Sequence, residues 1–145
     1  MAIVKVLARG WKVEVGNGAN PETFIEIKGL KSLGFDNEKT DADTTSFDED
    51  GAKSHIVASR GSKLSLEGNF LEDQTNGSRD PGQQAVEDLA ELIGPASLGN
   101  FRLTSPGGKM RNFIASANVS GIGGGTDDPT GWKADITVSG KIIKT

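Results

Sequence analysis

The chain has 145 residues, a formal net charge of −4 and a pI near 5.0, so it lacks the basic excess that is typical of nucleic-acid-binding domains. It contains no cysteine, which excludes disulfides, thiol nucleophiles and cysteine-based zinc sites. No apolar run approaches the ~20 residues of a membrane span and the N-terminus lacks signal-peptide features, so we expect one domain, residues 1–145, without membrane segment or leader.

Alternation of apolar and polar residues dominates the chain and predicts strands. The pattern begins at residues 11–15, where Trp11, Val13 and Val15 share one face. It continues through residues 23–30, 63–70, 100–104, 112–122 and 132–142. A period of two with one polar face is typical of half-buried antiparallel strands. The twenty glycines, about twice the usual share, indicate many turns between these strands.

A long acidic stretch follows the first pair of predicted strands. Residues 36–51 read DNEKTDADTTSFDEDG, and seven of these sixteen residues are acidic. We expect a loop that runs on to about residue 60, which exceeds the roughly 12–15 residues of an idle connection. Because long loops in small domains are usually functional or disordered, the stretch is our candidate interaction surface. Its candidate residues are Asp41, Asp43, Thr44, Thr45, Phe47, Asp48, Glu49 and Asp50.

The acidic stretch allows three interpretations on its residues alone: a calcium site, a solvated loop, or a surface for a partner. An EF-hand needs Gly at its sixth position and Glu at its twelfth. A loop that begins at Asp41 has Ser46 and Ala52 at these positions, and one that begins at Asp48 has Lys53 at the sixth. The EF-hand motif therefore fails. Another kind of calcium site, a solvated charge run and an interaction role stay open.

One segment breaks the alternation and predicts a helix at about residues 81–93. Asp80 suits the N-cap, and Pro81 suits the first helical position. Gln83 completes a capping-box pattern, and Gly94 ends the segment. The apolar stripe that we expect to pack against the sheet comprises Val86, Leu89, Ala90 and Ile93.

No set of residues supports catalysis or cofactor binding. The glycine-rich run at residues 121–126 precedes a turn and a strand, whereas a phosphate-binding loop opens a helix. His55 is the only histidine, and a histidine-based metal site needs several ligands. Basic residues are spread along the chain rather than clustered. We therefore expect no enzyme, no cofactor and no tight nucleic-acid binder.

The elements together predict a mainly β (α+β) fold, an antiparallel β-sandwich or barrel flanked by one α-helix. Their order resembles the tail tube proteins, or major tail proteins, of long-tailed bacteriophages. The most specific part is a Gly-Gln-x-Ala-[Val/Ile]-Glu-Asp run at residues 82–88, followed by a strand, a loop and a late strand that ends in Ser-Gly-Lys-Ile at residues 139–142. The resemblance extends over nearly the whole chain, from the acidic, Thr-rich stretch to the closing GWKADITVSGKI.

The resemblance implies a structural virion protein. Members of this family fold as a β-sandwich with one flanking helix, form hexameric rings and stack the rings into a tube through which the genome passes; type VI secretion tube proteins are similar in fold. The implied partners are further copies of the chain, a tape measure protein, a tail terminator and distal tail or baseplate proteins. DNA is implied only as passing cargo, no membrane is involved, and the location is the virion tail, assembled in the host cytoplasm.

The residues fit this resemblance, because an acidic surface does not retain DNA and a long loop can reach a neighbouring copy. On this hypothesis the acidic stretch is an assembly arm that docks on basic or polar sites of another copy. The rival hypothesis is a monomeric, calcium-dependent β-sandwich module for binding or adhesion. That rival predicts a thermal stability that rises with calcium.

Overall fold

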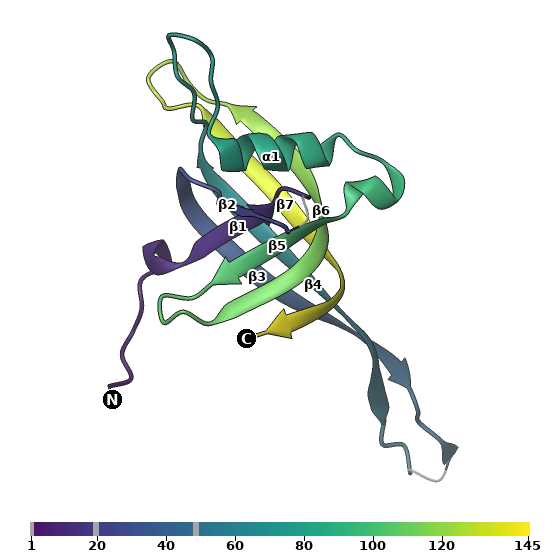
Figure 1. Cartoon of the computed structure of the whole chain (residues 1–145). Helices are drawn as coiled ribbons and strands as arrows, with labels where there is room; N and C mark the ends of the chain where they lie inside the picture. Colours follow the sequence, from purple (N-terminus) through teal and green to yellow (C-terminus); the bar gives the residue numbers. More distant parts are fainter. Residues whose placement is uncertain (1, 19–20, 48–49) are drawn as a thin grey trace.

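The computed structural model describes residues 2–18, 21–47 and 50–145, and the mainly β fold with a flanking α-helix is confirmed (Figure 1). The strands are β1 (Lys12–Gly16), β2 (Phe24–Glu26), β3 (Leu30–Asp43), β4 (His55–Asn69), β5 (Gly99–Thr104), β6 (Met110–Gly123) and β7 (Gly131–Lys144). The helix α1 (Pro81–Ala90) lies between β4 and β5 in the chain, and short 3₁₀ turns occupy Ala8–Gly10 and Gly94–Ser97.

The strands form one antiparallel sheet in the order β2-β1-β5-β6-β7-β4-β3. This sheet folds over on itself, because the ring of Phe35 on β3 lies 6.0 Å from the ring of Phe113 on β6, although two strands separate them in the sheet order. In Figure 1, β1 and β5 cross in front of β3 and β4, and α1 lies over one end of the strands. The architecture is therefore a single, strongly curved sheet that encloses its own core.

The core contains the apolar faces that the alternation predicts. Trp132, Phe101, Leu64, Leu66 and Ile136 are among its largest fully buried side chains. Their polar neighbours on the same strands face solvent, as the pattern of burial along β4 and β7 shows. Because β1, β5, β7 and the inner parts of β4 and β6 contribute alternate residues to the interior, they bury a continuous cluster together with Val86 of α1.

The helix begins where the sequence predicts and ends earlier. The carboxylate of Asp80 accepts a hydrogen bond of 3.1 Å from the backbone N–H of Gln83 and so caps the first turn. Val86 is fully buried, and Leu89 packs against the core. Ile93 does not share this environment, since α1 ends at Ala90 and the Ile93 side chain is 91% exposed. The chain turns there into an extended backbone that starts the next 3₁₀ turn, which the helical periodicity cannot reveal.

Gln83 does not complete the predicted capping box. Its side chain is fully buried, and its amide nitrogen donates to the carbonyl oxygens of Lys28 (3.0 Å) and Asn69 (2.8 Å). Its amide oxygen accepts from the backbone N–H of Leu71 at 3.1 Å and from the guanidinium of Arg79 at 3.3 Å. One side chain thus joins the helix to the segments on both sides of the β3–β4 hairpin.

The glycine before Gln83 permits this contact. A Cβ at Gly82 would collide with the carbonyl oxygen of Glu26 and the Cα of Ile27, so only glycine lets α1 approach the end of β2. On the next turn of the helix, Glu87 pairs with Arg79 at 2.8 Å. The Gly-Gln-x-Ala-Val-Glu-Asp run therefore has a structural role in attaching the helix to the sheet.

Candidate assembly interface

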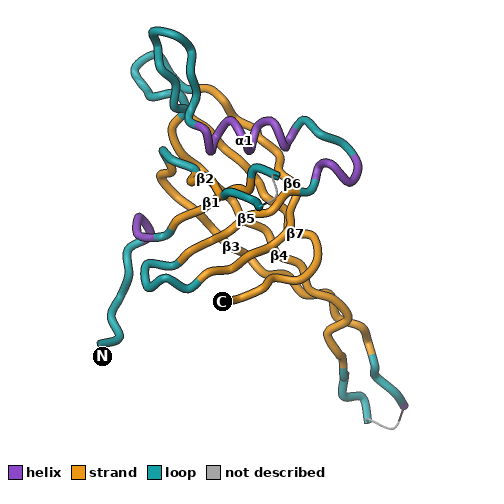
Figure 2. The backbone as a smooth tube through the Cα atoms, viewed as in Figure 1, coloured by secondary structure: helices purple, strands orange, loops and turns teal. Residues whose placement is uncertain are grey.

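The acidic stretch is a β-hairpin arm rather than the predicted long loop. We call residues 36–60 the hairpin arm. Strands β3 and β4 remain paired through it as far as Asp43 opposite His55, and only residues 44–54 connect the two strands. Figures 1 and 2 show the arm projecting away from the rest of the chain. Both faces of the arm lie in solvent, so its residues show no apolar alternation. For this reason the sequence pattern does not predict these strands.

The predicted interaction residues lie at the far end of this arm. Asp41 and Asp43 end β3, Thr44 and Thr45 begin the connection, and the Phe47 side chain is fully exposed. Asp50 has a positive φ of 49°, which is uncommon for a residue with a side chain. The remaining two predicted residues, Asp48 and Glu49, lie outside the described residues.

Hydrogen bonds order the described part of the tip. Thr45 donates its backbone N–H to a carboxylate oxygen of Asp43 at 2.8 Å, and its hydroxyl accepts from the backbone N–H of Ser54 at 2.8 Å. The Thr45 hydroxyl and backbone N–H lower the pKa of Asp43, which stays ionised near neutral pH. The tip therefore presents fixed negative charge beside an exposed phenyl ring.

The arrangement of these carboxylates bears on the calcium hypothesis. Within residues 2–18, 21–47 and 50–145, no three His, Asp or Glu side chains gather closely enough to hold a metal ion. The carboxylate of Asp41 lies 3.9 Å from the imidazole of His55 on the facing strand. The described tip therefore carries exposed carboxylates that are not gathered into a metal site.

Large apolar side chains are exposed at four places outside the core. They occur in the extended N-terminal segment, after the end of α1, on the hairpin arm, and on β6 and β7. The exposed residues at these places are Ile3, Val4, Val6, Leu7, Leu92, Ile93, Leu98, Phe47, Ile56, Val57, Ile114, Ile122 and Ile143. Exposed apolar groups of this number in a small domain indicate protein–protein contact surfaces.

Two long strands leave backbone groups open along their edges. In the described part of the chain, β3 pairs only with β4, so its other edge is free over Leu30–Asp43. On β6, pairing with β5 stops at Ala115, and no strand among the described residues pairs with residues 116–123 on that side. Unpaired edges of this length are templates for strand addition by another chain.

The outer face of the sheet between these edges is polar. In register on β4 and β7 lie Ser65 opposite Asp135 and Glu67 opposite Lys133. Ser116, Asn118 and Ser120 continue this polar face on β6. Its charges alternate in sign, so the face offers no basic platform to nucleic acid. Ile114, which is 47% exposed, is an apolar exception on the same face of β6.

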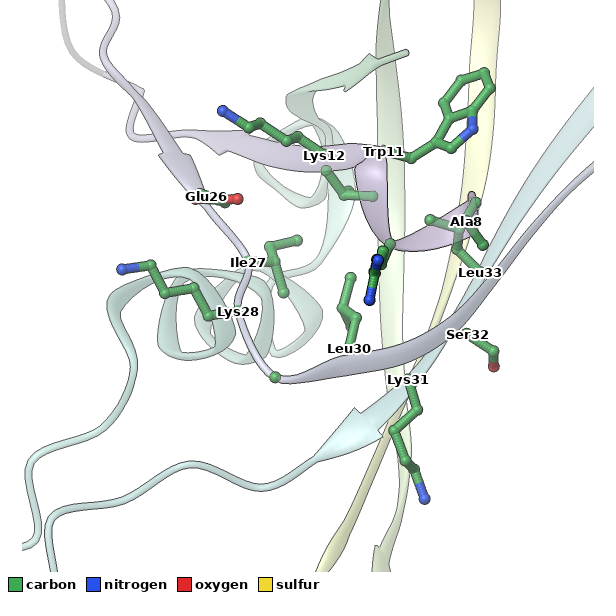
Figure 3. Close-up of a pocket in the computed structure, with 13 residues that line it drawn as sticks. Ala8, Trp11, Lys12, Glu26, Ile27, Lys28, Leu30, Lys31, Ser32 and Leu33 are labelled. Carbon is green, nitrogen blue, oxygen red and sulfur yellow. The ribbon is translucent and has the colours of Figure 1, made fainter. Parts of the chain in front are cut away.

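A pocket of about 280 Å³ lies between the start of β1 and the β2–β3 connection (Figure 3). Ile27 and Leu30 line its middle, while the ammonium groups of Lys12 and Lys28 extend outward. Glu26 is the single carboxylate among the lining residues. The pocket therefore brings together no acid–base pair and no activated nucleophile. No helix in the described chain is long and apolar enough to span a membrane.

The fold matches those of chains in tail-like particles. A chain of the virion of the native gene transfer agent (GTA) particle has 14% identity and a TM-score of 0.72, and the match covers 97% of this chain and 99% of that one. A chain in the tail of an empty GTA particle, obtained with helical refinement and C6 symmetry, has 14% identity, the same coverage and a TM-score of 0.76.

A chain in the 6-fold symmetrised baseplate of the anti-feeding prophage (AFP) has 9% identity and a TM-score of 0.61, over 100% of this chain and 97% of that one. No family model and no curated protein matches by sequence. The resemblance to tail tube proteins that the sequence indicates is thus confirmed for the fold, over the full length of the chain.

Proposed function

We propose that the chain is the subunit of a phage-like tail tube, a structural virion protein without catalytic activity. Six copies form a ring, and rings stack into a tube that conducts DNA during ejection. The observation that carries this proposal is the pair of unlike open edges, β3 on one side and residues 116–123 of β6 on the other. The likeness to chains in particles with C6 or 6-fold symmetry supports it.

Unlike edges favour a closed ring of identical copies. When β3 of one copy pairs with β6 of the next, each contact is heterologous, and a fixed rotation at each step closes the ring. The polar outer face of β4, β6 and β7 then lines the lumen, where its balanced charges do not retain DNA. The exposed apolar residues of the N-terminal segment and the α1 end become contacts between subunits.

The partners follow from this role. Copies of the chain are the principal partner. The further partners are a tape measure protein, a tail terminator and distal tail or baseplate proteins. The protein is located in the virion tail after assembly in the host cytoplasm. DNA is cargo in transit, and the fold offers it no basic wall along the polar face.

The test is negative-stain electron microscopy of the purified protein over a concentration series, with and without calcium. We expect sixfold rings or hollow tubes that increase with protein concentration and are indifferent to calcium. Analytical ultracentrifugation on the same samples should show the matching shift from monomer to assembly. Monomers at every concentration whose melting temperature rises only with calcium would overturn the tube and favour the calcium-dependent binding module.

A further inference from the structure

A basic cleft lies at the base of the hairpin arm. It has a volume of about 660 Å³ and is lined by parts of β3, β4, β6 and the end of β7. Five of its lining residues are cations and one, Glu38, is a carboxylate. The cations are Lys39, Arg60, Arg111, Lys141 and Lys144. In the sequence these residues are scattered over more than a hundred positions, and only the register of the strands gathers them.

The register places like charges directly opposite each other. Lys39 lies across from Arg60 on the β3–β4 ladder, and Arg111 lies across from Lys144 on the β6–β7 ladder. Like charges in such pairs destabilise a sheet. Two of these pairs in one cleft raise the positive potential there, in a chain whose net charge is −4.

Glu38 is the one carboxylate among the lining residues, and no ion pair joins it or another acidic side chain to the five cations in the described structure. The ion pairs among the described residues join His55 to Asp41, Arg79 to Glu87 and Arg102 to Glu14. The guanidinium of Arg111 lies over the ring of Trp11, 5.7 Å from its centroid. The cleft therefore fits an anionic occupant from outside the subunit.

The tip of the hairpin arm has the complementary charge. Asp41, Asp43 and Asp50 are exposed there, on a narrow two-stranded projection. The tip of the same chain cannot fill the cleft, because β3 and β4 stay extended and paired from the cleft out to Asp43 opposite His55. A second copy carries the same tip on its own arm.

We propose that the acidic tip of one copy docks into the basic cleft of a neighbouring copy. This inference rests on the proposed tube function and names the contact through which the arm contributes to it. The contact joins different surfaces of the two copies, so it repeats from copy to copy as a head-to-tail assembly requires. Because both surfaces are exposed before docking, salt screens the attraction and weakens assembly.

Cysteine cross-linking tests the contact, because the chain has no cysteine of its own. Asp43→Cys and Lys141→Cys are prepared as separate proteins, mixed, assembled and oxidised. We expect a disulfide-linked dimer on non-reducing gels in the mixture and not in either protein alone. The control mixture combines Asp43→Cys with Lys31→Cys, because Lys31 is an exposed lysine that lines the pocket between β1 and the β2–β3 connection. This control should give at least tenfold less dimer. Equal dimer yields in the two mixtures would overturn the docking.

Charge reversal tests the attraction itself. The cleft variant Lys141→Glu with Lys144→Glu should lose at least tenfold of the assembled fraction in sedimentation, whereas Lys12→Glu with Lys31→Glu should retain it. Adding Asp41→Lys and Asp43→Lys to the cleft variant restores opposite charges between copies and should restore assembly. Circular dichroism and denaturant unfolding confirm that each variant is folded.

The outcomes separate this docking from the function on which it rests. Wild-type rings together with an unaffected cleft variant would overturn the docking and leave the tube intact. A cleft variant that assembles normally but loses retention of double-stranded DNA would assign the cleft to nucleic acid instead. Wild-type protein that forms neither rings nor tubes at any concentration would overturn the tube and the docking together.

Discussion

Strands β3 and β4 run from the body of the molecule into the hairpin arm, yet their burial differs between the two regions. In the inner half of β4, Leu64 and Leu66 are buried and alternate with solvent-facing residues. In the outer half, residues 55–61 are exposed on both faces. The inner residues pack in the interior of their own chain, whereas the proposed function assigns the outer ones to contacts with other copies. A change in either region should therefore affect a different measurement.

The largest effect on the isolated subunit is expected at Trp132. This side chain is 1% exposed, and its indole N–H makes no hydrogen bond among the described residues, so its contribution is packing. Trp132→Ala should lower the free energy of unfolding by about 4 kcal/mol, measured by urea denaturation monitored by circular dichroism. Phe47→Ala at the exposed tip is the matched control. A comparable loss of unfolding free energy in this variant would show that the arm contributes to stability as the body does.

Gln83 should show the next largest effect. Gln83→Leu keeps the volume but deprives Lys28, Asn69 and Leu71 of their partner inside the body. We expect a loss of about 3 kcal/mol in the free energy of unfolding. The neighbouring Gln84 is exposed, and its side-chain amide donates to the exposed Asp88, so Gln84→Leu should change stability by less than ~0.5 kcal/mol. Equal effects of the two substitutions would show that Gln83 does not join the segments.

Shortening the arm should separate assembly from stability. Thr40 and Ser59 are opposite in register, so an Asn-Gly turn can replace residues 41–58 between them. We expect the free energy of unfolding to change by less than ~0.5 kcal/mol, because none of the described residues in the removed segment is buried. Rings and tubes should disappear from electron micrographs. Normal tubes from the shortened chain would show that the arm is not an assembly element.

The smallest effect concerns the titration of Asp43. Thr45 lowers the pKa of this carboxyl in the folded chain, so the contribution of Asp43 to stability is present above its ordinary pKa and is lost as the pH falls through the lowered value. Thr45→Val should raise the pKa toward the ordinary one, as observed by NMR titration of the carboxyl carbon. An unchanged titration curve would mean that Thr45 does not hold the Asp43 carboxylate.

Sequence patterns predicted those parts of the fold in which burial alternates. The faces of β1, β4 and β7 and the N-cap at Asp80 follow from period and capping chemistry. The strands of the arm are not predictable in this way, because both of their faces are exposed to solvent and their charged sequence is typical of a loop. The apolar period predicts an end of α1 that is too late, since Ile93 continues the period after the helix has ended.

The candidate site was predictable only in part. The acidic tip is contiguous in sequence, so its charge is visible without a structure. Lys39 and Arg60 meet across one hairpin, and Arg111 and Lys144 across another, so their concentration depends on strand register. Gln83 was assigned to capping because the spacing from Asp80 fits that motif, whereas the backbone groups it binds come from distant segments.

The exposed faces of the arm also have a mechanical consequence. Bending a sheet that covers a core separates packed side chains, so the body resists deformation. Bending the outer arm exposes nothing apolar that was covered, and small rotations can be distributed over its many strand pairs. The register shift between Thr40 and Asp41 adds local twist at one point along it. If subunits are joined through such arms, as we propose, the filament can curve as a whole while each body keeps its shape.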